Sequence, residues 1–128
     1  MRLPKIIISV LLFATLFLVM SFTVTKKYIE KSLIEICDAA SEKYDCLPRK
    51  ALLFQLSDNT TGIEQMNRTI WAIGKMKMNT ALPKLENMHE ACKNITYQYY
   101  KCNYELEKTI GYFKSGKIDL MPFEDLSK

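Results

Sequence analysis

Glycine and proline are scarce in this sequence, with four of each in 128 residues. Because turns between short strands draw heavily on both residue types, their scarcity disfavours a many-stranded β fold and favours long helices. The sequence also lacks a nucleophile elbow, a phosphate-binding loop and a dinucleotide-binding fingerprint. We therefore predict an all-α protein that is not an enzyme and holds no cofactor.

Histidine occurs only once, as His89. His89-Glu90 resembles the start of a metalloprotease helix motif, but Lys93 stands four residues later where the second metal ligand is needed. The spacing between the cysteines also exceeds the about two to four residues that are usual in zinc sites. We predict no metal site, and we expect His89 to be an exposed helix residue.

The residues that follow the N-terminal segment carry nearly equal numbers of positive and negative charges. Residues 26–128 carry 16 lysines and arginines against 14 aspartates and glutamates, and no basic cluster lies on one predicted face. This near balance argues against a nucleic-acid partner. The length fits one domain whose core alone is marginal, so covalent cross-links would matter to its stability.

A long uncharged run covers residues 6–24 and follows the basic residues Arg2 and Lys5. As a helix it would be about 28 Å long, close to the roughly 30 Å hydrocarbon core of a bilayer. Segment 1–25 is therefore predicted to be a signal peptide or an uncleaved signal anchor. Either role exports the chain from about residue 26 onward, as a secreted protein or as a single-pass protein held in the membrane by the uncharged run alone.

Four helical stretches are predicted, because apolar residues recur there every three or four positions. They cover about 27–45, a short run at 51–56, about 61–78, and a long C-terminal helix from about 81 to 113. The predicted domain is a small disulfide-stapled bundle of three to four helices over residues 26–116. Residues 117–128 form a C-terminal tail.

Four cysteines form two similarly spaced pairs, Cys37 with Cys46 and Cys92 with Cys102. Nine or ten residues of helix span about 13–15 Å, whereas bonded cysteines need Cα atoms within about 7 Å. Bonds within a pair are therefore excluded if both stretches are helical. Four alternating helices make the first and last helices antiparallel, so we favour Cys37–Cys102 with Cys46–Cys92. Parallel helices favour Cys37–Cys92 with Cys46–Cys102, and spacing alone satisfies both.

Three N-x-[ST] tripeptides follow the N-terminal segment and agree with an exported chain. They begin at Asn59, Asn67 and Asn94. Asn59 lies in a polar, turn-like run from Ser57 to Gly62, which makes it the best glycan candidate. Together with the even number of cysteines, these sites predict a disulfide-bonded extracellular glycoprotein.

Tyrosines are concentrated on the predicted C-terminal helix. Tyr97, Tyr100 and Tyr104 fall away from the helix face that would enter the core. Partly exposed tyrosines on a rigid helix are effective contact residues. These three are the predicted binding surface for an extracellular protein or cell-surface partner.

Methionines support an alternative function, a small extracellular carrier of an apolar ligand. Flexible thioether side chains can line an adaptable apolar cavity, although they more often fill gaps in a core. The methionines concerned are Met66, Met76, Met78, Met88 and Met121.

The pattern Leu85-x6-Cys92-x9-Cys102, which follows the first cysteine pair and an N-terminal signal segment, resembles a family expanded in nematodes. Members of that family are secreted, helical, cysteine-framed domains of unknown function. The resemblance covers about residues 33–113 and implies an extracellular helical module without catalytic residues. The chain as a whole is thus predicted to be a secreted or surface-anchored protein that binds other proteins.

Overall fold

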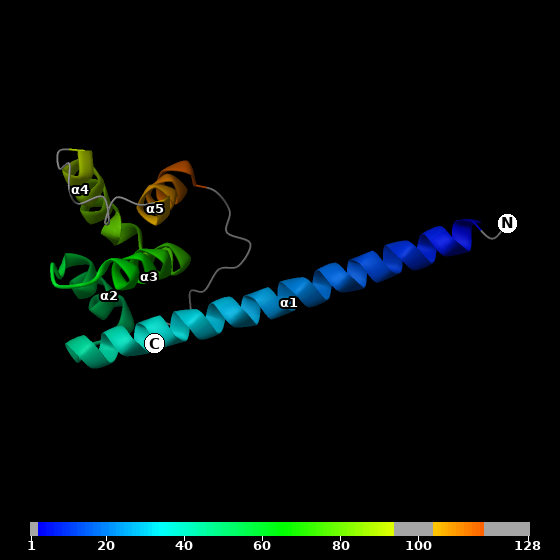
Figure 1. The fold of residues 1–128 in the computed structure, drawn as a ribbon, viewed down its shortest axis with the longest axis horizontal. Coiled ribbons are helices and arrows are strands. Elements are labelled where there is room, and N and C mark those ends of the chain that lie inside the picture. The colour runs from blue at the N-terminus through cyan, green and yellow to red at the C-terminus, as the bar shows by residue number, and fades with distance from the viewer. Residues whose placement is uncertain (1–2, 94–103, 117–128) are drawn as a thin grey trace. The chain divides into compact units, whose positions relative to one another are not determined.

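The computed structural model describes residues 3–93 and 104–116, and these described residues form helices only. The helices are α1 (Leu3–Tyr44), α2 (Pro48–Ser57), α3 (Ile63–Lys75), α4 (Leu82–Lys93) and α5 (Tyr104–Ser115), with a 3-10 turn at Asn79–Ala81 (Figure 1). The predicted all-α class is confirmed. Contacts divide the chain into two units, Met1–Ser32 and Leu33–Lys128.

The first unit contains the apolar part of α1. No glycine or proline lies between Pro4 and Pro48, so no helix-breaking residue interrupts α1 along its 42 residues. The helix that we predicted from about residue 27 is therefore the continuation of the apolar run. The longest helix of the described chain is at the N-terminal end, which corrects the prediction of a long C-terminal one.

The end of α1 belongs to the second unit and enters its core. Leu33, Ile36 and Ala40 are buried at steps of three and four residues, as the sequence pattern predicted, and Cys37 beside them is buried as well. Helix α1 ends at Tyr44, and the next residue has a left-handed backbone that turns the chain toward α2.

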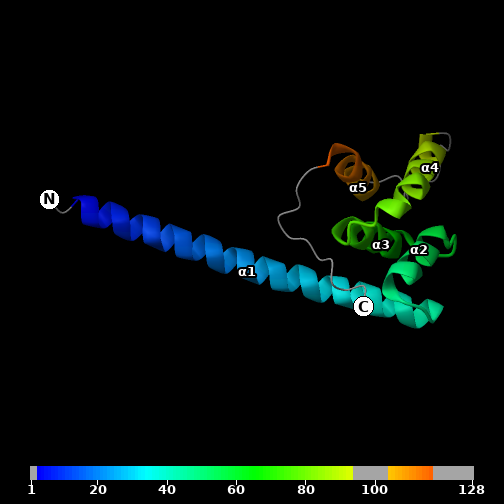
Figure 2. The ribbon, with the colours of Figure 1, turned by 180° about the vertical axis from the view of Figure 1, so that it is seen from behind.

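Helix α2 begins at Pro48, where a proline is tolerated because the first turn leaves its N–H groups unbonded in any case. The predicted loop between Ser57 and Gly62 separates α2 from α3, as expected. Helix α3 contacts both α2 and α5 (Figure 1, and from behind in Figure 2). On the α5 side, Gly74 lies so close to Thr109 that a Cβ atom would be 3.2 Å from the Thr109 methyl carbon.

Helices α4 and α5 pack against each other, which a single straight helix over the same residues does not allow. Lys114 Nζ lies 2.8 Å from Glu86 Oε1, although 28 residues of continuous helix would separate these positions by about 42 Å. Leu85 and Leu106 are both fully buried, so each helix supplies a side chain to the core. The C-terminal helical stretch is therefore two helices that pack together.

Candidate functional site

The apolar run on α1 exposes its side chains. Phe13 is 74% exposed and Phe17 is 66% exposed, and the run resembles neither a core helix nor an amphipathic surface helix. In the described part of the chain, α1 is the one helix long and apolar enough to cross a membrane, and none of its most apolar 18-residue window is buried. This agrees with a signal peptide or membrane anchor.

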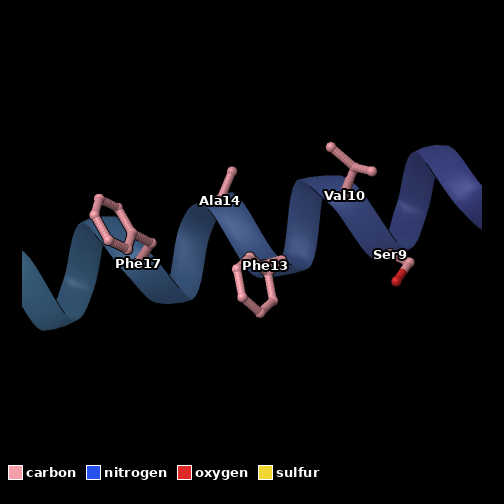
Figure 3. A pocket seen from close by; sticks show the side chains of 5 residues that line it. All are labelled: Ser9, Val10, Phe13, Ala14 and Phe17. Carbon is pink, nitrogen blue, oxygen red and sulfur yellow. The ribbon is translucent and has the colours of Figure 1, made fainter.

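A shallow hollow lies on this part of α1. Figure 3 shows its five lining side chains, which are Ser9, Val10, Phe13, Ala14 and Phe17. All of them belong to adjacent turns of one helix, and they project to different sides of it. The hollow is therefore the space between neighbouring side chains on a helix surface, and it does not have the enclosing walls of a small-molecule site.

The three threonine hydroxyls within and just after the apolar run are satisfied inside the helix. Thr15 Oγ1 donates to the Leu11 carbonyl oxygen at 2.7 Å, and Thr23 Oγ1 donates to the Val19 carbonyl oxygen at 2.9 Å. The Thr25 hydroxyl likewise donates to the carbonyl oxygen of Ser21, four residues earlier, at 2.8 Å. These side chains therefore place no unbonded hydroxyl on the helix surface.

Asp58 joins the end of α1 to the turn between α2 and α3. Its carboxylate accepts hydrogen bonds from the Tyr44 hydroxyl at 2.6 Å and from the backbone N–H and hydroxyl of Thr60 at 2.9 and 2.6 Å. Lys43 Nζ is 3.2 Å from the same carboxylate. The Thr60 and Tyr44 hydroxyls, in that order, hold the pKa of Asp58 well below its ordinary 3.8. This cluster fixes the exposed turn that carries Asn59.

An apolar surface lies beside this cluster on α2. Leu47 at the start of α2 is 67% exposed, and Phe54, two turns further along the same face, is 47% exposed. The Tyr44 ring centre lies 6.1 Å from that of Phe54, and Lys50 Nζ lies 5.7 Å from the Phe54 ring centre. We call these four residues the Leu47–Phe54 surface.

The predicted tyrosine surface falls largely outside the described residues. Tyr97 and Tyr100 are not described, and Tyr104 is the first residue of α5 with a side chain that is not described. The Leu47–Phe54 surface was missed by sequence reasoning. The sequence does contain an apolar pair seven residues apart, Leu47 and Phe54. It does not show whether such a pair on a short helix faces the core or the solvent.

The structure departs from the predicted disulfides. Cys37 and Cys46 are free thiols, and every predicted pairing needs one of them, so none of those pairings is present. Cys92 does take part in a disulfide, and neither of these thiols is its partner. Because α4 and α5 are separate helices, the geometric reason for excluding a bond between Cys92 and Cys102 no longer holds. Cys102 lies outside the described residues.

The two free thiols have different environments. Cys37 is buried between α1 and the end of α3, with its Sγ atom 3.6 Å from Met76 Sδ. Burial, more than the nearby Asp38 carboxylate, raises the pKa of the Cys37 thiol to about 11. Cys46 is half-buried and follows the end of α1.

The sequons also differ in their surroundings. Asn59 is exposed in the turn between α2 and α3, whereas Asn67 is half-buried on α3. Asn94 lies outside the described residues. Of the two described sequon asparagines, Asn59 is therefore the more accessible.

The methionines and the histidine considered for a carrier or a metal site are buried or half-buried wherever the structure describes them. Met66, Met76 and Met78 are buried in the core, Met88 is half-buried, and Met121 lies outside the described residues. His89 was expected to be exposed but is half-buried on α4, and its Nδ1 atom has no hydrogen-bond partner among the residues described. Among those residues no group of three or more potential metal ligands occurs.

Comparison with known proteins adds no assignment. No protein-family model, no curated protein and no solved structure matches the chain. The resemblance to the nematode-expanded family therefore stays a prediction.

Proposed function

We propose that this protein is an exported helical module that binds another protein and is not an enzyme. The apolar part of α1 supports export, because a basic start followed by an uncharged helix is typical of signal peptides and signal anchors. The exposed position of Asn59 in a turn supports it as well, because a sequon in such a turn is accessible for glycosylation.

The observation that carries the binding proposal is the Leu47–Phe54 surface. Surface apolar residues are common singly, but here Leu47 and Phe54 share one face and the Tyr44 ring adjoins it. Burying what remains exposed of the two side chains would contribute about 2 to 3 kcal/mol to a complex. That is a typical share for the central residues of a protein interface.

The partner's chemistry follows from the charges on α2. This helix contains Arg49 and Lys50 and no acidic residue. Lys50 is exposed beside the Phe54 ring, so it is available to a carboxylate at the rim of an interface. We expect a protein partner with an apolar centre and at least one acidic residue beside it.

The test compares two substitutions that each add one negative charge. Leu47→Asp places the charge on the proposed surface, and Asn87→Asp places it at an exposed position on α4. The full chain is expressed in cells of its source and treated with an amine-reactive cross-linker. Proteins cross-linked to Lys50 are then identified by mass spectrometry.

We expect the Leu47→Asp variant to lose Lys50 cross-links that the wild type and the Asn87→Asp variant retain. Equal thermal unfolding of the two variants would show that the loss is not caused by misfolding. An unchanged set of Lys50 cross-links in a folded Leu47→Asp variant would contradict the proposed surface.

A further inference from the structure

We infer that residues 6–24 remain part of the mature protein and cross a lipid bilayer as a single transmembrane anchor. This inference rests on the proposed export of the chain and specifies how the exported module is held. The apolar surface of residues 6–24 would then contact the hydrocarbon chains of the bilayer. The alternatives are a cleaved signal peptide and a helix covered by a second copy of the chain.

The apolar surface of residues 6–24 surrounds the helix. Consecutive residues of an α-helix point about 100° apart, so Ile6, Ile7 and Ile8 already point in three widely different directions. Their side chains are 58%, 52% and 57% exposed. Further along, Leu16 to Met20 form another consecutive apolar stretch, each of them more than half exposed. A single protein partner covers one side of a helix, whereas a bilayer covers every side.

The length and the backbone bonding of the run also fit a bilayer. The 19 residues of the run span about 28 Å, which matches the roughly 30 Å thickness of the hydrocarbon. In hydrocarbon every backbone polar group needs a partner inside the protein. The helix bonds its own backbone, and the Thr15 and Thr23 hydroxyls donate to carbonyl oxygens four residues earlier.

Polar residues stand at both ends of the apolar run. Lys5 precedes the run, and Lys26, Lys27 and Tyr28 follow it directly, all of them exposed. Lysines and tyrosines are typical of the two interfaces of a bilayer, where the ammonium group reaches water and the tyrosine ring lies at the level of the headgroups. Tyr28 is 73% exposed, so its ring is free to occupy that level.

Retention is supported by the backbone at the possible cleavage sites. The small-residue patterns are Val19-Met20-Ser21 and Ser21-Phe22-Thr23, and neither is the preferred Ala-x-Ala. Both lie inside α1, and the Thr23 and Thr25 hydroxyls bond to carbonyl oxygens within this stretch. With no glycine or proline nearby to end the helix, cleavage would have to unwind a continuous helical segment.

The experiment expresses the full chain with a C-terminal epitope tag in cells of its source. Membranes are washed with alkaline carbonate, and the N-terminal peptide of the protein is identified by mass spectrometry. A matched variant carries Val19→Ala and Ser21→Ala, which creates an Ala-x-Ala site and keeps the length of the run. Deglycosylation and protease digestion of intact cells report which side of the membrane holds the helical unit.

We expect the wild type to stay in the washed membrane pellet with residues 6–24 present, and the variant to reach the medium without them. Wild-type protein in the medium and lacking these residues would overturn the anchor and leave the proposed export intact. Full-length wild type in the medium as a soluble oligomer would overturn the anchor in favour of a second copy. Full-length protein that is unglycosylated and protected on intact cells would overturn both proposals.

Discussion

Substitution of Leu33 tests whether the end of α1 belongs to the core of the helical unit. Leu33 is completely buried, whereas the neighbouring Ile34 is 38% exposed on another side of the same helix. Leu33→Ala should lower the free energy of unfolding by about 2 to 5 kcal/mol, because it removes buried methyl groups and leaves a cavity. Ile34→Ala should change it by less than about 1 kcal/mol, since much of that side chain stays in water and alanine favours helix.

Thermal unfolding of the full chain in mild detergent, followed by circular dichroism, measures both variants. For a unit of this size each kcal/mol shifts the unfolding midpoint by about 4 to 8 °C, so Leu33→Ala should lose about 10 °C or more. The Ile34→Ala midpoint should stay within about 5 °C of the wild type. Similar, small shifts for both variants would show that α1 does not pack into the unit through Leu33.

Three further predictions follow from particular contacts. Gly74→Val should destabilise the protein by about 1 to 3 kcal/mol, because the added side chain would collide with Thr109. Gly111→Ala has open space around it and should stabilise α5 by up to about 1 kcal/mol in the same unfolding assay. Asp58→Asn should lower stability near pH 7, and the difference from the wild type should shrink below pH 3.8, because a carboxylate with a lowered pKa loses its contribution as it is protonated. Iodoacetamide at pH 8 should label Cys46 quickly and Cys37 slowly, and unfolding without reductant should make the two labelling rates similar. If neither cysteine is labelled in denaturant, both are in disulfide bonds.

Several elements could be predicted because local chemistry determines them. The uncharged run on α1, the short helix around residues 51–56 and the polar turn before α3 each depend on residues close in the sequence. The buried stripe at the end of α1 also followed from its three-and-four spacing. These are the features that a sequence pattern is able to specify.

The pairing of α4 with α5 could not be predicted in this way. Apolar residues continue in helical register from Leu85 to Phe113, and no glycine or proline lies between Pro83 and Gly111. Periodicity gives the spacing along a helix but does not say whether two helices in the same register pack together. The wrong disulfide prediction followed from this point, because it assumed one continuous helix.

The Leu47–Phe54 surface was missed for a related reason. The short run on α2 contains several large apolar residues, of which Leu52 and Leu56 are buried and Phe54 is not. Which of them faces the core depends on the position of α3, a tertiary contact that the pattern of a six-residue run does not specify.

Glycan occupancy at Asn59 tests export of the helical unit most directly. The full chain is compared with Asn59→Gln and with Asn87→Gln, which lies outside any sequon, before and after enzymatic removal of N-glycans. Because Asn67 and Asn94 also begin sequons, we expect the wild type and the Asn87→Gln control to show a larger gel shift than the Asn59→Gln variant. A wild-type chain whose mobility does not change on deglycosylation would contradict export to the glycosylating side of the membrane.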